Sequence, residues 1–522
     1  MQIAIAQLNY KTGDIQGNCQ KMISAIRQAQ QTSAELIVFP ELAICGAMPQ
    51  DLLEREEFIN ECRLAIEKIA LQCTRIAAIV GGPNLDATNG IMYNSAYFIQ
   101  NGEVVDGVHK NILSDYDIFN ESRYFIAGED NTAIRYKNQN IRIIFDEYEA
   151  EFIDKSDHFV VFMGMTPFTT ESPKNKRQIL AALARKYGKN IIAVNHCCGN
   201  TSVLFDGNSM AVNFKGNTVC TLGEFAEDFQ IVDTNKMGAR PSVPHTSEDK
   251  IALMHKALVF GIRDYFEKHG FTKAILGLSG GIDSAVVAAL AAEALGAQQV
   301  KGLLMPSRFS TDHSVTDAEA LARNIGMPYE ILPIKEIYDQ YLNTLQPVFQ
   351  NEPFNVAEEN LQARIRGMLV MAMSNKFGYI ALNTSNKSEA AVGYGTLYGD
   401  LCGSLGVIGD VYKTDVYKLA RHINKDREII PENTLTKAPS AELRPGQKDQ
   451  DSLPEYAQLD AILELYLEEN HSPENIIAQG FPEDVVRKVI HLTNRNDYKR
   501  AQVPACIKIS KKAFGSGRKY PY

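Results

Sequence analysis

Residues 274–290 read AILGLSGGIDSAVVAAL, and this stretch decides the fold of the second half of the chain. An apolar run leads directly into the segment Ser279–Ser284, and an Ala- and Val-rich run follows it. Two adjacent glycines let the backbone approach an anion closely, and the amino end of a helix offers free N–H groups and a positive dipole end. The pattern predicts a strand, a phosphate-binding loop and a helix.

The residues of this loop indicate which phosphate chemistry it serves. No G-K-[ST] follows the glycines, so the loop is not the P-loop of kinases and GTPases. Ser279 and Ser284 can donate hydrogen bonds, whereas Asp283 would repel a bare phosphate, so its presence indicates a bound Mg²⁺. The alternative is a plain glycine turn with a serine cap. The strand before and the helix after favour the phosphate site.

The segments around the loop alternate between strands and helices. This alternation predicts a doubly wound α/β domain, in which ligands bind at the carboxyl ends of the strands. A long amphipathic helix, 251–269, precedes the loop strand. The expected strands are 273–278, 300–305 and 379–382, and the expected helices are 285–295, 317–325 and 361–377.

The first half of the chain also alternates short apolar strands with amphipathic helices, which favours a layered αββα sheet domain. The segment Asp233–Asp249, rich in Pro, Gly and small polar residues, predicts a linker between domains 1–240 and 241–522. The expected strands are 2–7, 36–39, 76–81, 95–100, 141–145, 159–163, 191–195 and 209–213, and the expected helices are 18–30, 51–71 and 176–187.

Composition excludes several classes of protein. The 522 residues are 45% hydrophobic and 22% charged, which excludes wholesale disorder. A net charge of −10 makes a general nucleic-acid binder a poor interpretation. Nine scattered cysteines without a C-x-x-C motif argue against a disulfide framework and favour a reducing cytoplasm. No apolar run approaches the ~18 residues of a membrane span, and the first residues lack the pattern of a signal peptide.

The run SGGIDS resembles the pyrophosphate loop of the N-type ATP pyrophosphatases, which activate a carboxylate or carbonyl oxygen by adenylation. That group includes GMP, asparagine and argininosuccinate synthetases and tRNA-modifying thiolases. The loop alone does not choose among them. Three later segments are similar to NAD synthetase: ENLQARIRG at 359–367, LNTSNKSE at 382–389 and KAPSAELRPGQ at 437–447.

This resemblance implies a Rossmann-like ATP-pyrophosphatase domain that converts deamido-NAD to NAD. It implies a role for each of the matching residues. Asp283 and Glu389 are expected to hold Mg²⁺ on the polyphosphate, and Asn360, Glu389 and Lys508, the last in a basic tail, are expected to contact deamido-NAD. The residues expected to hold ATP are Gly277, Leu278, Ser279, Gly280, Gly281, Ile282, Asp283, Ser284 and Thr384.

The first ~235 residues resemble the nitrilase-like glutaminase domain of two-domain bacterial NAD synthetases. The resemblance rests on LIVFPELAICG at 36–46, HKNIL at 109–113 and FDGNS at 205–209. It implies an αββα sandwich in which Glu41 is the general base and Lys110 stabilises the oxyanion. Tyr116 and Thr166 match positions expected to bind glutamine.

The cysteine nucleophile of such a glutaminase is missing from its expected place. The family has it after a strand, and here the strand 141–145 is followed by Asp146, or the position falls on Phe145 one residue earlier. Neither side chain is a thiol. The run GNTS at 199–202 also replaces the family's Gly-Gln-Asp-Glu. Cys197 and Cys198 lie near this altered loop, and we expect them to be buried, inert thiols.

These observations lead to one main hypothesis and three alternatives. The main hypothesis is an NAD synthetase that uses ATP, Mg²⁺ and ammonia, acts on small molecules in the cytoplasm, and forms a homo-oligomer as its family resemblance implies. The first alternative is a working glutaminase with a displaced nucleophile. The second is another N-type ATP pyrophosphatase that amidates or thiolates a different substrate. The third is a non-catalytic scaffold with two decayed domains.

Overall fold

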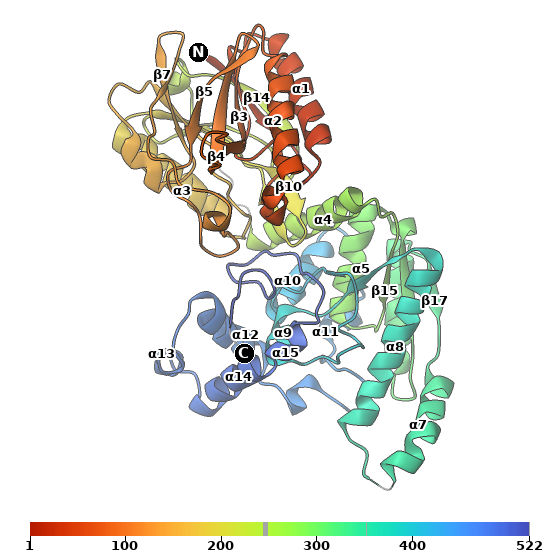
Figure 1. Cartoon of the computed structure of the whole chain (residues 1–522). Helices are drawn as coiled ribbons and strands as arrows, with labels where there is room; N and C mark the ends of the chain where they lie inside the picture. Colours follow the sequence, from red (N-terminus) through yellow and green to blue (C-terminus); the bar gives the residue numbers. More distant parts are fainter. Residues whose placement is uncertain (244–248, 351, 521–522) are drawn as a thin grey trace. The chain divides into compact units, whose positions relative to one another are not determined.

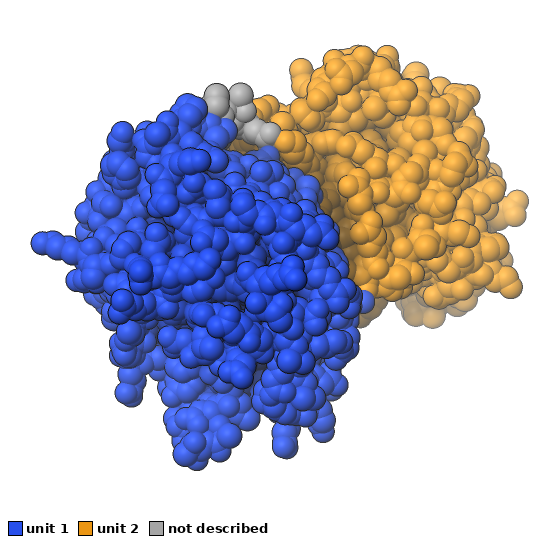
Figure 2. Space-filling model, turned by 90° about the horizontal axis from the view of Figure 1, so that it is seen from above, with its two compact units in different colours: residues 1–247 blue, residues 248–522 orange. Residues whose placement is uncertain are grey.

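The structure is a computed structural model that describes residues 1–243, 249–350 and 352–520. The chain forms two compact units, residues 1–247 and 248–522 (Figure 2). Part of the predicted linker, residues 244–248, lies outside the described residues. None of the described helices is both long and apolar enough to cross a membrane.

The first unit contains two six-stranded sheets with helices on their outer faces, as the αββα interpretation predicts (Figure 1). Helices α1 (Ile15–Gln30) and α2 (Glu56–Ala70) cover one sheet, and α3 (Ser172–Tyr187) covers the other. The first sheet has the order β14 (Asp228–Asp233), β1 (Gln2–Gln7), β2 (Leu36–Val38), β3 (Ala77–Leu85), β4 (Met92–Gln100), β5 (Glu103–His109). The second has β13 (Thr218–Thr221), β12 (Met210–Val212), β9 (Asn190–Ala193), β8 (Phe159–Phe162), β7 (Gln139–Ile144), β6 (Ile134–Tyr136).

Strand periodicity explains why both faces of the first sheet are buried. Side chains alternate between the two faces of a strand. In β1, Ile3 and Ile5 join the core between the sheets, whereas Ala4 and Ala6 join the core beneath α1 and α2. The strand is therefore apolar at consecutive positions. It pairs in parallel with β2 and antiparallel with β14, so the first and last strands of this unit are neighbours.

The second unit is built on a five-stranded parallel sheet with the order β17 (Tyr329–Ile331), β16 (Val300–Leu304), β15 (Ala274–Gly277), β18 (Ile380–Asn383), β19 (Leu405–Gly406). The chain proceeds outward from β15 on one side and then returns to add β18 on the other. The switch point therefore lies between β15 and β18, where a doubly wound sheet binds its ligand.

Helices flank this sheet and extend beyond it (Figure 1). The principal helices are α4 (Lys250–His269), α5 (Ile282–Leu295), α6 (Asp312–Ile325), α7 (Lys335–Phe349) and α8 (Val356–Phe377). The smaller helical elements that follow are α9 (Lys387–Val392), α10 (Lys413–Ile423), α11 (Glu432–Thr436), α12 (Tyr456–Leu463), the π-helical turn η7 (Glu464–Glu468), α13 (Pro473–Ala478), α14 (Glu483–Arg495) and α15 (Asp497–Arg500). Several of the latter share an apolar core around Leu459 and Val486.

Candidate active sites

A cavity of about 470 Å³ opens at the switch point of the second unit. Its walls come from the loop after β15, the face of α8, the residues after β18, and the segment 437–449. Most of the nucleotide and substrate residues predicted from sequence meet here: Gly277, Leu278, Ser279, Gly281, Ile282, Asp283, Ser284, Asn360, Thr384 and Glu389. Gly280 and Lys508 are outside this lining.

The phosphate loop is held in shape by its own serines. Ser284 Oγ donates to the carbonyl of Gly281 at 3.0 Å and lies 3.2 Å from Ser279 Oγ. Gly280 has φ of +76°, and a Cβ there would lie 2.3 Å from the backbone oxygen of Ser314. Only glycine fits this position. The loop leads directly into α5, so its backbone N–H groups surround the site that an anion would occupy.

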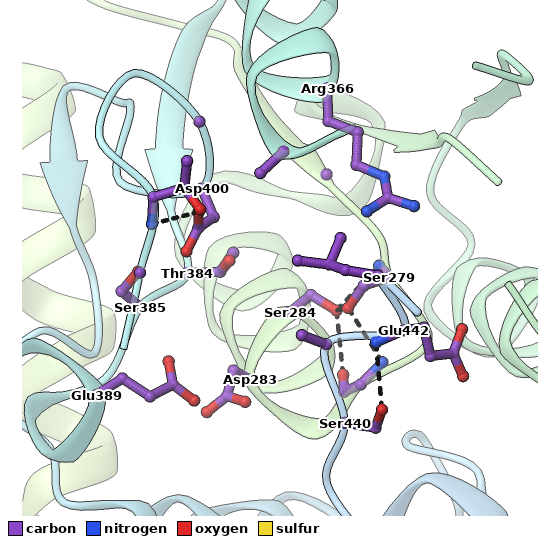
Figure 3. A pocket seen from close by; sticks show the side chains of 18 of the residues that line it. Ser279, Asp283, Ser284, Arg366, Thr384, Ser385, Glu389, Asp400, Ser440 and Glu442 are labelled. Atoms are coloured by element: carbon purple, nitrogen blue, oxygen red, sulfur yellow. Dashed lines mark hydrogen bonds between the residues drawn. The ribbon is translucent and has the colours of Figure 1, made fainter. Parts of the chain in front are cut away.

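Asp283 and Glu389 lie side by side in the lining of the cavity, with their carboxylates pointing toward one another (Figure 3). Lys413 Nζ lies 2.5 Å from an oxygen of Asp283 and 3.1 Å from one of Glu389. Asn386 donates to the other oxygen of Asp283 at 2.9 Å. Burial raises the pKa of Glu389 to about 8, Lys413 opposes this rise, and the neighbouring carboxylate of Asp283 adds to it. Both carboxylates thus contact the same group, the ammonium of Lys413.

The cavity is also lined by cationic side chains that the sequence patterns did not reveal. Arg366 reaches in from α8, with its Nε donating to the carbonyl of Met305 at 3.0 Å (Figure 3). Lys437 and Lys499 also line the cavity, from segments far apart in the sequence. Burial lowers the pKa of Arg366 and of Lys499. Cationic side chains around a cavity of this size are suited to phosphorylated ligands.

Asn360 and Thr384 both line the cavity. Asn360 Oδ1 accepts a hydrogen bond from Thr396 Oγ1 at 2.7 Å, which fixes its orientation on α8. Thr384 directly follows β18, at the carboxyl edge of the sheet. Both residues therefore occupy the kind of position at which the doubly wound fold binds ligands.

Lys508, which the resemblance assigns to deamido-NAD binding, is outside the cavity lining. Its side chain is fully buried, and Nζ donates to the carbonyl of Ser510 at 2.9 Å. The next residues are held by Asp410, which accepts hydrogen bonds from the backbone of Ile509 and Ser510. A contact between Lys508 and a dinucleotide stays a prediction.

The first unit contains a second polar site, which is buried. Lys110 Nζ lies 2.9 Å from Glu41 and 2.7 Å from Glu121, and Asn94 donates to Glu41 at 2.6 Å. The backbone N–H of Met165 donates to the other Glu41 oxygen at 2.8 Å. Burial raises the pKa of Glu41 to about 7, against the opposing effect of Lys110. Burial would lower the pKa of Lys110, but the two glutamates raise it above its usual value.

Asp146 does not join this pair. Strand β7 ends at Ile144, and the next side chain, Phe145, is buried in the core between the sheets. Asp146 is half-buried, and its carboxylate accepts a hydrogen bond from the backbone N–H of Tyr148 at 2.9 Å. Across the described residues, Lys110 forms ion pairs with Glu41 and Glu121 only. Glu41 and Lys110 thus form a direct ion pair, and Asp146 makes no ion pair with Lys110.

The two residues predicted to bind glutamine, Tyr116 and Thr166, differ in their exposure and contacts. Tyr116 is 58% exposed and packs edge-on against Phe119. Thr166 is tied through its backbone N–H and carbonyl to the side-chain amide of Asn195, each at 3.2 Å. In the altered loop, Asn200 donates to the carbonyl of Ala47 at 2.9 Å, so its amide is used for structure.

The cysteines near the altered loop are buried, as expected. Cys197 and Cys198 are each 1% exposed and lie on β10 (Cys197–Asn200), which pairs with β11 (Val203–Asp206). Cys45 is also buried, and burial raises the pKa of its thiol. A buried thiol in a protonated state is a poor nucleophile.

Comparisons with known proteins cover the whole chain. The carbon-nitrogen hydrolase family matches residues 2–240, and the NAD synthase family matches residues 254–503. A glutamine-dependent NAD(+) synthetase of Synechocystis is 41% identical over 548 aligned residues, which cover 99% of this chain and 98% of that protein. One from Thermotoga maritima is 37% identical and covers 100% and 98%.

Two solved structures extend this similarity to three dimensions. A glutamine-dependent NAD+ synthetase from Acinetobacter baumannii, in complex with ADP, is 36% identical with a TM-score of 0.80, covering 100% of this chain and 98% of that one. A glutamine-dependent NAD(+) synthetase from Cytophaga hutchinsonii has a TM-score of 0.86 at 21% identity, covering 100% and 97%, and it supports the fold alone.

Proposed function

We propose that this chain, which belongs to the family of glutamine-dependent NAD(+) synthetases, forms NAD from deamido-NAD and ATP with ammonia as its nitrogen donor. The full-length identity to NAD synthetases supports the first part of this proposal. The position of Asp146 supports the second. The enzyme is a carbon–nitrogen ligase, and its reaction has two steps.

In the first step, the nicotinate carboxylate attacks the α-phosphorus of ATP, and the bond to the pyrophosphate oxygen breaks. The leaving group gains negative charge, so the catalytic need is neutralisation and orientation. The backbone of the loop 279–284 and the ammonium of Lys413 meet this need, because they line the cavity where a triphosphate would extend from the loop. Arg366 and Lys437 are suited to hold further anionic groups.

Asp283 and Glu389 fit a Mg²⁺ ion. They supply the carboxylate oxygens that Mg²⁺ prefers, and both already contact one cationic atom, so their positions suit a shared cation. Bound beside them, Mg²⁺ would neutralise polyphosphate charge and assist the departure of pyrophosphate. Lys413 would remain as a second positive charge at the same place.

In the second step, ammonia attacks the acyl carbon of the adenylate, the bond to AMP breaks, and the nitrogen loses a proton to give the amide. This step needs only neutral ammonia at the cavity. We assign no glutamine hydrolysis to the first unit, because amide cleavage through a thioester requires a thiolate next to the base. Glu41 and Lys110 then act as a buried ion pair that organises the unit.

Two further properties complete the proposal. We expect a homo-oligomer, as the family resemblance implies. A cytoplasmic location is consistent with nine scattered cysteines that form no C-x-x-C motif. Hydrolysis of glutamine by a displaced nucleophile is the competing proposal, and burial of Cys197 and Cys198 weighs against it.

An assay of NAD formation tests the whole proposal. Purified protein is supplied with ATP, Mg²⁺ and deamido-NAD, and either ammonium or ammonia-free glutamine is added. We expect NAD, AMP and pyrophosphate in equal amounts with ammonium, and none with glutamine. Absence of deamido-NAD-dependent pyrophosphate release would refute synthesis itself. Equal rates with both donors would refute only the choice of ammonia.

A further inference from the structure

Helix α9 begins with three consecutive polar residues whose side chains contact different surroundings. Glu389 faces the cavity, and Ser388 hydrogen-bonds to Asp460 on α12. Lys387, in the same run, is outside the cavity lining, and its side chain is fully buried. A buried lysine requires several partners to offset its lost hydration. The role of Lys387 is therefore separate from direct contact with the bound ligand.

The partners of Lys387 come from three distant segments. Its Nζ lies 2.8 Å from Asp410, 2.5 Å from Glu468 on η7, and 2.7 Å from Ser510 Oγ near the end of the chain. The ammonium also lies 4.8 Å from the ring centre of Tyr412. We call Lys387, Asp410, Glu468 and Ser510 the Lys387 cluster.

The two carboxylates of the Lys387 cluster also bind the carboxyl-terminal segment 506–511. Asp410 accepts hydrogen bonds from the backbone N–H groups of Ile509 and Ser510, at 2.8 and 2.7 Å, and from Ser510 Oγ at 2.7 Å. Glu468 accepts one from the N–H of Lys511 at 3.0 Å. One ammonium faces two carboxylates, so the donors of segment 506–511 supply the remaining compensation of charge.

The same segment is attached to the edge of the parallel sheet. Gly406 on β19 donates to the carbonyl of Ala505 at 2.9 Å, and Ile507 donates back to Gly406 at 3.2 Å. Within the cavity lining, no residue beyond Lys499 is present in the described part of the chain. The segment 506–511 thus supports the site from outside.

The Lys387 cluster is directly connected to the cavity carboxylates and their lysine. Lys387 is two residues from Glu389 on α9, and Asp410 is three residues before Lys413. The backbone N–H of Lys413 donates to Ser388 Oγ at 2.9 Å, so the starts of α9 and α10 are joined. A displacement at Lys387 would move both Glu389 and Lys413.

We propose that Lys387 is a positioning residue that couples docking of the segment 506–511 to the placement of Glu389 and Lys413 in the cavity. The coupling rests on the proposed function, since it concerns the step that releases pyrophosphate. Without the segment, Asp410 loses three hydrogen-bond donors, and the Lys387 ammonium loses one acceptor, Ser510 Oγ. The ion pairs of Lys387 then rearrange. As a result, Asp283 and Glu389 lose their shared contact with Lys413.

The test compares Lys387→Met with a matched control, Lys376→Met, which removes an exposed lysine from α8. For Lys387→Met we expect pyrophosphate release to fall about 100-fold, the loss typical of a misplacement near 1 Å, while ATP binding to the phosphate loop changes little. Trypsin should cleave faster after Lys511 and Lys512 in this variant. The control should match the wild type in all three measurements.

Several outcomes would overturn the proposal. One is that Lys387→Met shows unchanged turnover and unchanged trypsin cleavage. Another is that it loses ATP binding and turnover equally, which indicates unfolding. If Lys387→Met does not fold, the variants Lys387→Arg and Ser510→Ala test the coupling instead. We expect Lys387→Arg to retain part of the wild-type rate of pyrophosphate release. Ser510→Ala should lose less of this rate than Lys387→Met, again with little change in ATP binding. Full activity of Ser510→Ala would refute the coupling. Failure of the wild type to release pyrophosphate would refute the proposed function, while the trypsin comparison still tests docking.

Discussion

The ammonium of Lys413, at the start of α10, lies 2.5 Å from the carboxylate of Asp283 in the first turn of α5, 130 residues earlier in the chain. A second carboxylate, Glu389, shares this ammonium. The contact places two acids and a permanent positive charge at the end of the phosphate loop. Such a group can hold a divalent cation and neutralise a leaving pyrophosphate at the same place.

Replacing Asp283 by Asn should abolish pyrophosphate release while the protein stays folded. The amide keeps the size of the side chain but loses the charge that holds Mg²⁺ and pairs with Lys413. Circular dichroism and an ATP–deamido-NAD pyrophosphate assay across a range of Mg²⁺ concentrations check this. Near-normal turnover at any Mg²⁺ concentration would contradict the metal role.

Replacing Gly280 by Ala should impair ATP binding, and Gly296→Ala is the matched control. Both glycines have positive φ, at +76° and +90°, so each alanine costs about 1–3 kcal/mol of backbone strain. A Cβ at position 280 also meets Ser314 O at 2.3 Å, whereas at position 296 it meets nothing within 4 Å. Chemical denaturation and equilibrium ATP binding should show that both variants lose stability but only Gly280→Ala loses affinity.

Glu41→Gln should change how the stability of the protein depends on pH. The raised pKa of Glu41, about 7, means that the folded state retains a proton that the unfolded state releases near its ordinary value of about 4.5. The stability that this proton contributes is present in full below pH 4.5 and is lost as the pH rises to 7. The free energy of unfolding of the wild type should therefore fall with pH across this window relative to Glu41→Gln. Parallel curves for the two proteins would contradict the raised pKa.

Asp146→Cys should leave NAD formation dependent on ammonium. A new thiol supplies a nucleophile, but the side-chain amide of Asn200 remains bound to the carbonyl of Ala47 and does not rebuild a glutamine pocket. Losing the nucleophile of a catalytic unit costs on the order of 10⁶ in turnover, so the wild type should also show negligible glutaminase activity.

The double variant Cys197→Ala/Cys198→Ala provides the control for a displaced nucleophile. We expect its rates with ammonium and with glutamine to equal those of the wild type, because both thiols are buried. Glutamine-dependent synthesis in the wild type that disappears in this variant would identify one of these cysteines as the nucleophile.

Local patterns were sufficient to predict the architecture of both units. The strand before the phosphate loop and the helix after it lie almost where the sequence places them, because apolar runs and glycines act over short distances. Helix α8 begins at Val356, five residues before the expected start at Leu361. A capping box formed by Asn355 and Glu358 marks that start, and it is a local signal that the apolar pattern alone overlooks. The expected helix 51–71 begins instead with a 3₁₀ turn before α2.

The site residues that the sequence did not predict are placed by contacts between distant parts of the chain. Lys413 and Lys387 are each buried by partners more than twenty residues away, and lysine is ordinarily an exposed residue. Lys508 differs for the same reason: a run of basic residues suggests an exposed tail, but docking onto Asp410 buries its first lysine. Only the folded chain reveals which of these charges are solvated.

The pairing of β1 with β14 has a consequence for how the first unit can be handled. Its chain enters and leaves at adjacent strands of one sheet, where Gln2 is opposite Asp233. A domain with neighbouring ends tolerates circular permutation, because a short peptide can join those ends without breaking its internal connections. A short link from residue 233 to residue 2, with new ends opened in an exposed loop, should therefore preserve both sheets of this unit.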